Sequence, residues 1–180
     1  ISPGVVDGWR GGMSESAVKA FQRRAGLPMT GQMDHAVWDL LQGYAAQPIT
    51  MDYTITEEDA FGLVDNIPAD YGEKAKMSSQ GYTSILEKLA ERFHMDEKFM
   101  VKLNPGTEFM PGATIHVTAP AKPIRATVTR IIVDKATRRV AAYDARGRLV
   151  ADYPATVGST ETPSPHGNHV VDAVALNPTY

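Results

Sequence analysis

Histidine carries most of the chemistry that this sequence could perform at neutral pH, because an imidazole can gain or lose a proton there. The chain contains five histidines and no cysteine. His166 and His169 lie close together after a proline-containing run, but two histidines without a third ligand make a weak metal site. His94 and His116 also lack a partner at a metal-ligand spacing. We therefore expect no metal, no cofactor and no catalytic residue in this chain.

Two clusters of charge are further candidates for binding. The run Glu57-Glu58-Asp59 has calcium-type ligands but lacks the alternating spacing of a calcium loop, so we predict a solvated loop. The pair Arg23 and Arg24 could meet anionic groups, although a solvated helix face is the simpler interpretation.

The composition limits the class of protein further. The chain has 180 residues, of which 43% are hydrophobic and 22% charged, and a net charge of −3. Such a mixture is typical of folded proteins and provides no basic field for a nucleic-acid partner. No apolar run approaches the length of a membrane span.

The charge changes along the chain at two proline-rich joints, and these predict three modules. Residues 1–48 carry four basic and four acidic side chains, residues 49–119 carry six and twelve, and residues 120–180 carry eight and five. We expect an α+β protein of several modules with boundaries near these joints.

Residues 1–48 have the pattern of two short helices. Ser14 is predicted to cap the first helix, Gly26 to end it and Asp34 to cap the second. Apolar residues at helical spacing, Phe21, Trp38 and Leu41 among them, are expected to form a core. Two short helices cannot enclose a full core, so a third element is expected upstream.

The landmarks of this module resemble the small three-helix peptidoglycan-binding domain. The resemblance rests on these residues: Asp7-Gly8, Ser14, Ala17-Val18, Phe21-Gln22, Gly26-Leu27, Gly31, Asp34, Trp38 and Leu41. It implies binding to peptidoglycan, with the first helix of the family missing here.

Residues 49–119 are predicted to form strand, helix, helix, strand. The strands are expected at residues 51–56 and 114–118, with helices capped by Ser84 and Asp96 and a polar stretch over residues 57–81. The order, with Asn104-Pro105 and Pro111-Gly112, is similar to the LysM fold and implies glycan binding. An insertion of about twenty-five residues after the first strand departs from that family, and a spacer that binds nothing is the alternative.

Residues 120–180 are rich in β-branched residues and turns. Strands are expected at residues 127–134, 139–143 and 149–158, and a fourth near residues 170–174. A larger sheet cut after four strands would leave unpaired edges, so we predict contact with a strand of another chain or poor order.

The order of landmarks in this module is similar to the start of the L,D-transpeptidase catalytic domain of the YkuD type, which is mostly β. The residues are Val133-Asp134, Tyr143, Gly147, Tyr153-Pro154, Val157-Gly158, Thr162-Pro163, Pro165, Gly167, Val174, Asn177-Pro178 and Tyr180. The resemblance implies peptide cross-linking of peptidoglycan through a cysteine thioester. It places Tyr180 near the substrate cleft, whereas the nucleophilic cysteine is absent, so the chain as given should be inactive.

Three hypotheses follow. The first is the N-terminal portion of a periplasmic or cell-envelope L,D-transpeptidase, exported and truncated at both ends, whose partners are the glycan strands and stem peptides of peptidoglycan. The second is a non-catalytic wall-binding protein, which the missing cysteine favours. A cytoplasmic interaction protein is the third, and no residue pattern supports it.

Overall fold

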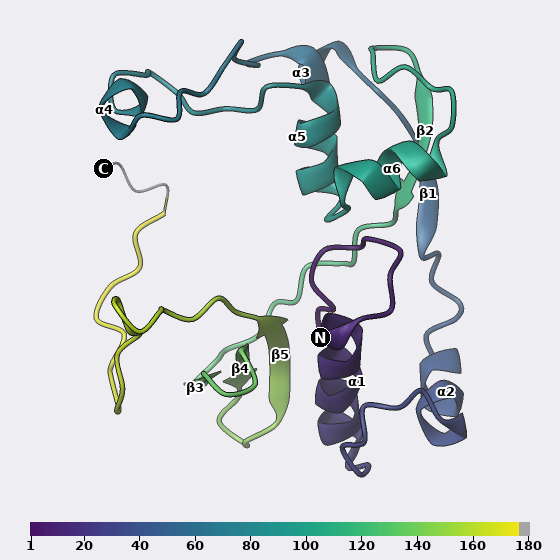
Figure 1. Cartoon of the computed structure of the whole chain (residues 1–180). Coiled ribbons are helices and arrows are strands. Elements are labelled where there is room, and N and C mark those ends of the chain that lie inside the picture. Colours follow the sequence, from purple (N-terminus) through teal and green to yellow (C-terminus); the bar gives the residue numbers. More distant parts are fainter. Residues whose placement is uncertain (177–180) are drawn as a thin grey trace.

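The computed structural model describes residues 1–176, in which helices and two antiparallel sheets alternate along the chain (Figure 1). In chain order the elements are α1 (Gly12–Ala25), α2 (His35–Gln42), β1 (Thr50–Thr54), α3 (Glu57–Ala60), α4 (Tyr71–Lys74), α5 (Ile85–Arg92), α6 (Glu97–Leu103), β2 (Thr114–Thr118), β3 (Arg130–Asp134), β4 (Arg139–Tyr143) and β5 (Leu149–Pro154).

Helices α1 and α2 are joined by a turn that a buried glutamine organises. The side chain of Gln22 donates to the Thr30 hydroxyl at 2.8 Å and accepts the Gly31 N–H at 2.8 Å. Gly31 has a φ of +75°, and a Cβ there would lie 2.6 Å from the Glu15 side chain. Glycine is therefore required at this turn, since a side chain would be both strained and too close.

The predicted ends of these helices are confirmed at two of three positions. Gly26 ends α1 in the left-handed conformation, and Asp34 caps α2 by accepting the Val37 N–H at 3.0 Å. The cap predicted at Ser14 is wrong, because α1 begins earlier. Gly11 is its N-cap and provides no side-chain hydrogen bond.

The predicted core of this module is partly wrong. Val37 is fully buried and Leu41, one turn later, is half-buried, but Trp38 remains 55% exposed. Consecutive helical residues point about 100° apart, so the inward position of Val37 turns Trp38 towards solvent.

Residues 50–118 contain the largest hydrophobic core of the described chain. Strands β1 and β2 pair antiparallel from Thr50↔Thr118 to Thr54↔Thr114, and α5 and α6 pack beside them. The buried side chains are Ile55, Leu89, Ala90, Phe93, Met95, Met100, Ile115 and Val117. The expected order of strands and main helices is confirmed, with the caps at Ser84 and Asp96. The resemblance to LysM stays a prediction.

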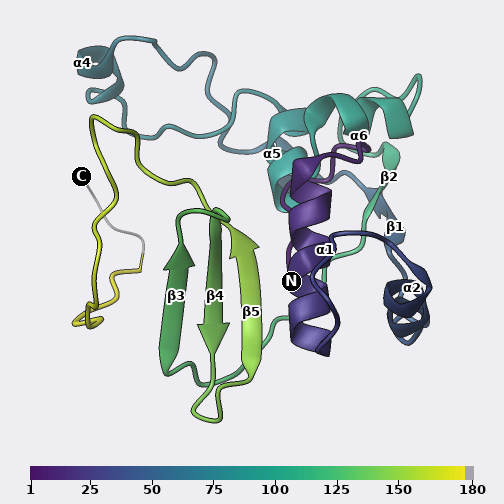
Figure 2. The ribbon, with the colours of Figure 1, turned by 60° about the horizontal axis from the view of Figure 1, so that its bottom comes forward.

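Strands β3, β4 and β5 form an antiparallel sheet in that order, with a register shift between Ala142 and Tyr143. Figure 2 shows α1 lying along the β5 side of this sheet, while β3 forms the opposite edge. The predicted fourth strand is wrong for the described residues. Val170, Val171 and Val174 are exposed and outside any strand, because no strand within residues 1–176 pairs with them.

The N-terminal segment holds the parts together through its backbone. The Ser2 N–H donates to the Asp152 carbonyl at 2.8 Å, and the Val6 N–H donates to the His94 carbonyl at 2.8 Å. The Asp96 N–H donates to the Val6 carbonyl at 2.9 Å. The N-terminal segment therefore contacts both β5 and the joint between α5 and α6.

Candidate functional site

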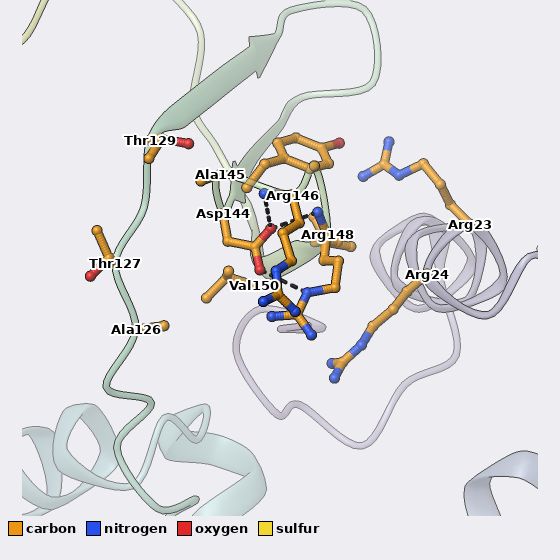
Figure 3. A pocket seen from close by; sticks show the side chains of 13 residues that line it. Arg23, Arg24, Ala126, Thr127, Thr129, Asp144, Ala145, Arg146, Arg148 and Val150 are labelled. Atoms are coloured by element: carbon orange, nitrogen blue, oxygen red, sulfur yellow. Dashed lines mark hydrogen bonds and ion pairs between the residues drawn. The ribbon is translucent and has the colours of Figure 1, made fainter.

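An arginine-lined cavity lies between the C-terminal end of α1 and the turn that joins β4 to β5. Its volume is about 1010 Å³. The lining residues are Arg23, Arg24, Ala126, Thr127, Thr129, Tyr143, Asp144, Ala145, Arg146, Gly147, Arg148, Leu149 and Val150. Figure 3 shows Arg24 of α1 extending towards Arg146 and Arg148 of the turn.

The turn is shaped by Asp144, whose carboxylate collects three donors. Its Oδ1 accepts the N–H groups of Arg146 and Arg148, each at 2.9 Å, and its Oδ2 accepts Nε of Arg148 at 2.8 Å. The bond from the Arg148 N–H is the largest of the effects that lower the pKa of Asp144. Asp144 thus stays ionised and holds the two arginines on either side of Gly147, which has a φ of +73°.

The α1 side of the cavity is supplied by Arg23 and Arg24 in the last turn of the helix. Cations are favoured there because the helix dipole places partial negative charge at the C-terminus. Arg23 also forms an ion pair with Asp152 of β5. The predicted solvated face is confirmed for both arginines, which are exposed, and Arg23 in addition joins the helix to the sheet.

Asp152 is the centre of this junction and is fully buried. Besides Arg23, it accepts Nε of Arg139, whose side chain is only 5% exposed. Arg139 also donates to the Ser2 carbonyl at 2.9 Å and to the Ser16 hydroxyl at 3.3 Å. These bonds satisfy the buried charges and fix α1 against β5. Because both elements line the cavity, the bonds also fix its two walls relative to each other.

The expected solvated loop at Glu57-Glu58-Asp59 is also wrong, because these residues begin α3. Asp59 is 1% exposed. Its carboxylate accepts the Thr56 N–H at 2.8 Å, the Tyr53 hydroxyl at 2.7 Å and the Arg92 guanidinium at 2.6 Å. These bonds complete the capping box of α3 and hold the helix against β1 and α5.

The histidines do not converge on a catalytic or metal site within residues 1–176. His166 Nε2 lies 2.7 Å from Lys135 Nζ, and His116 Nδ1 lies 2.9 Å from Asp52. Across the same residues, no three His, Asp or Glu side chains gather as metal ligands. Tyr180, the predicted substrate-lining residue, lies outside the described residues.

A second recess of about 420 Å³ separates α1 from α2 and is mainly apolar. Its lining is Ile1, Pro3, Arg10, Ser14, Glu15, Ala17, Val18, Phe21, Gly31, Met33, Val37 and Leu41. Several landmarks of the three-helix resemblance, such as Phe21 and Leu41, therefore face a groove rather than a closed core.

Sequence reasoning identified the hairpin turn and the arginine pair of α1 but did not bring them together. The signal that it passed over is the run Asp144-Ala145-Arg146-Gly147-Arg148, in which two cations flank a glycine beside a turn-forming aspartate. The chemistry of the cavity is that of anion recognition, since guanidinium groups form paired hydrogen bonds with oxyanions.

Comparison with known families finds a match at each end of the chain. Residues 1–41 match the family model of a peptidoglycan binding domain, and residues 128–180 match the L,D-transpeptidase catalytic domain, YkuD. No curated protein matches the chain. The chain therefore has the domains of an L,D-transpeptidase-like protein and is related to the cell wall. These domains indicate a location in the cell envelope. Within residues 1–176, no helix is long and apolar enough to span a membrane.

Proposed function

We propose that this protein docks onto peptidoglycan and positions an L,D-transpeptidase-type domain against it. One observation carries the proposal: the two regions that match peptidoglycan families form the walls of one arginine-lined cavity. Arg23 and Arg24 come from residues 1–41, and Arg146 and Arg148 come from residues 128–180.

The contact between the two regions supports a shared task. A flexible tether would only raise the local concentration of one domain near the polymer. Here the buried ion pairs of Asp152 with Arg23 and Arg139 hold α1 beside β5 in one orientation. A glycan or peptide bound at α1 would thus lie at a fixed direction from the sheet.

The reaction proposed for the L,D-transpeptidase-type domain is acyl transfer between stem peptides in the periplasm or elsewhere in the envelope. A cysteine thiolate would attack a stem-peptide carbonyl, and an acceptor amine would resolve the thioester. The 180 residues contain no cysteine, so their own proposed part is docking and positioning. Sequencing the reading frame downstream of these residues tests this proposal. A cysteine-bearing motif there would support it, and a reading frame without one would favour the non-catalytic wall binder.

Residues 49–119 are proposed as a separate, LysM-like module for glycan binding. The support is the order of β1, α5, α6 and β2 around a closed core. We keep residues 48 and 119 as the proposed module boundaries. We also propose that β3, an edge strand of its sheet, contacts a strand of another chain.

Co-sedimentation with purified sacculi tests the docking. We expect the protein to pellet with peptidoglycan and to stay in the supernatant with cellulose of equal mass. Heat-unfolded protein and a charge-matched unrelated domain are the controls. Equal amounts in both supernatants at low salt would contradict the proposed function.

Incubation with purified muropeptides tests catalysis by these residues. Mass spectrometry should find no new L,D cross-link, because no thiol is present. A cross-linked product formed by this chain alone would overturn the cysteine-based chemistry.

A further inference from the structure

The arginine-lined cavity has more positive charge than its own acidic groups can balance. Arg148 is paired with Asp144, and Arg23 is paired with Asp152. Arg24 and Arg146 have no ion-pair partner within residues 1–176. Figure 3 shows Arg24 extending from α1 towards the ends of Arg146 and Arg148, whereas Arg23 points away from them.

Such an arrangement favours an anion for electrostatic reasons. Positive charges close together repel each other, and this repulsion raises the electrostatic energy of the site. A recess with low-dielectric walls also concentrates the positive field that they produce. An oxyanion placed between Arg24 and Arg146 would remove this repulsion and accept hydrogen bonds from both planar guanidinium groups.

The rest of the lining distinguishes between kinds of anion. Ala126, Leu149 and Val150 provide an aliphatic wall, and Thr127 and Thr129 also line the cavity. A phosphodiester polymer would place polar groups against this wall without hydrogen-bond partners, which is unfavourable. A peptide with small side chains can cover the wall while its carboxylate reaches the arginines.

We infer that the cavity binds a carboxylate-bearing peptide, with Arg24 and Arg146 as the carboxylate ligands and Leu149 and Val150 as the contact for its aliphatic groups. The volume of about 1010 Å³ accommodates several residues. The identity of that peptide as a peptidoglycan stem peptide rests on the proposed function, whereas the carboxylate site itself does not.

Titration with a matched pair of peptides tests the site directly. The probes are acetyl-Ala-Glu-Ala with a free carboxyl terminus and acetyl-Ala-Gln-Ala amide, observed through the backbone amide signals in NMR. We expect saturable shifts at the β4–β5 turn and at the end of α1, and about tenfold weaker binding of the uncharged peptide. Equal affinities for the two peptides would overturn the inference.

The variants use substitutions that keep side-chain length. In R24Q/R146Q the affinity for the charged peptide should fall about tenfold. K98Q/K102Q removes the same charge from exposed positions of α6 and should bind like the wild type. Unchanged affinity in R24Q/R146Q, with folding verified by circular dichroism, would overturn the site. Tighter binding of inorganic phosphate than of the charged peptide would overturn its assignment to peptide carboxylates.

Sacculi separate this inference from the proposed function. If wild type and R24Q/R146Q pellet equally and amidation of the sacculus carboxyl groups changes nothing, the docking stands and the assignment of the site to stem peptides fails. If the charged peptide binds at the cavity but the wild type never pellets, the site stands and the peptidoglycan assignment fails.

Discussion

At the residue scale, Asp59 links the stability of the protein to pH. Burial alone would raise its pKa, but the bonds from Thr56 and Tyr53 and the charge of Arg92 outweigh it and lower the pKa from 3.8 to about 2. A carboxyl whose pKa is lower in the folded state stabilises the fold above its unfolded pKa. That contribution, about 2 kcal/mol, is lost as the pH falls from about 4 to 2.

The first prediction concerns D59N. The substitution leaves the Arg92 guanidinium without its carboxylate partner. It also turns one of the two acceptor oxygens into an NH2 donor, so either Arg92 or the Thr56 and Tyr53 donors lose their acceptor. We expect the free energy of unfolding at pH 7 to fall by about 2–3 kcal/mol, measured by urea denaturation. The loss of stability between pH 4 and 2 should also become shallower.

E58Q is the matched control, because Glu58 is exposed and precedes Asp59 in the same helix. Its unfolding free energy should stay within about 0.5 kcal/mol of the wild type. A pH profile of D59N that overlays the wild type would show that another carboxyl sets the acid limit.

At the element scale, the helix caps include one correct and one wrong prediction at a serine. Ser84 accepts the Glu87 N–H at 3.1 Å and caps α5. Ser14, which is also predicted as a cap but has Ala17 where the capping box of Ser84 has Glu87, lies inside the first turn of α1, where Gly11 is the N-cap. The two serines should therefore respond differently to the same substitution.

The second prediction compares S84A with S14A. S84A should destabilise the protein by about 1 kcal/mol, because it leaves an N–H at the start of α5 without its acceptor. S14A should change stability by less than about 0.5 kcal/mol. Thermal unfolding of both variants measures the difference, and equal losses would mean that α1 begins at Ser14 in solution.

The elements that were predicted correctly are those set by local signals. Asp34, Ser84 and Asp96 cap helices because each side chain accepts an N–H three residues away, which depends on nearby sequence alone. The wrong predictions concern residues whose structure depends on contacts with residues far away in the sequence. Asp59 is bound by Arg92 from α5, a helix far away in the sequence. Residues 170–174 lack a neighbouring strand within residues 1–176. The arginine cavity was missed for the same reason, since α1 and the β4–β5 turn meet only in the folded chain.

At the scale of the whole molecule, the junction of α1 with β5 decides whether the two matched regions act as one body. Asp152 is fully buried and bound by Arg23 and Arg139, and Arg139 also bonds to Ser2 and Ser16. Removing one partner of a buried ion pair leaves the other charge without compensation, which costs about 3–5 kcal/mol. The apolar contact area elsewhere along this junction is small, since Ala20 is the one buried hydrophobic residue of α1 in the described chain.

The third prediction therefore concerns D152N, which removes the shared negative charge while keeping the shape of the side chain. We expect α1 to detach from β5 while residues 50–118 remain folded, because their core does not include this junction. Amide hydrogen exchange should accelerate at least about tenfold in α1 and β5 and stay unchanged in α5. D172N removes an exposed carboxylate and serves as the control. Uniform acceleration over all three elements would mean that the molecule unfolds as one unit and that the ion pairs are not a separable junction.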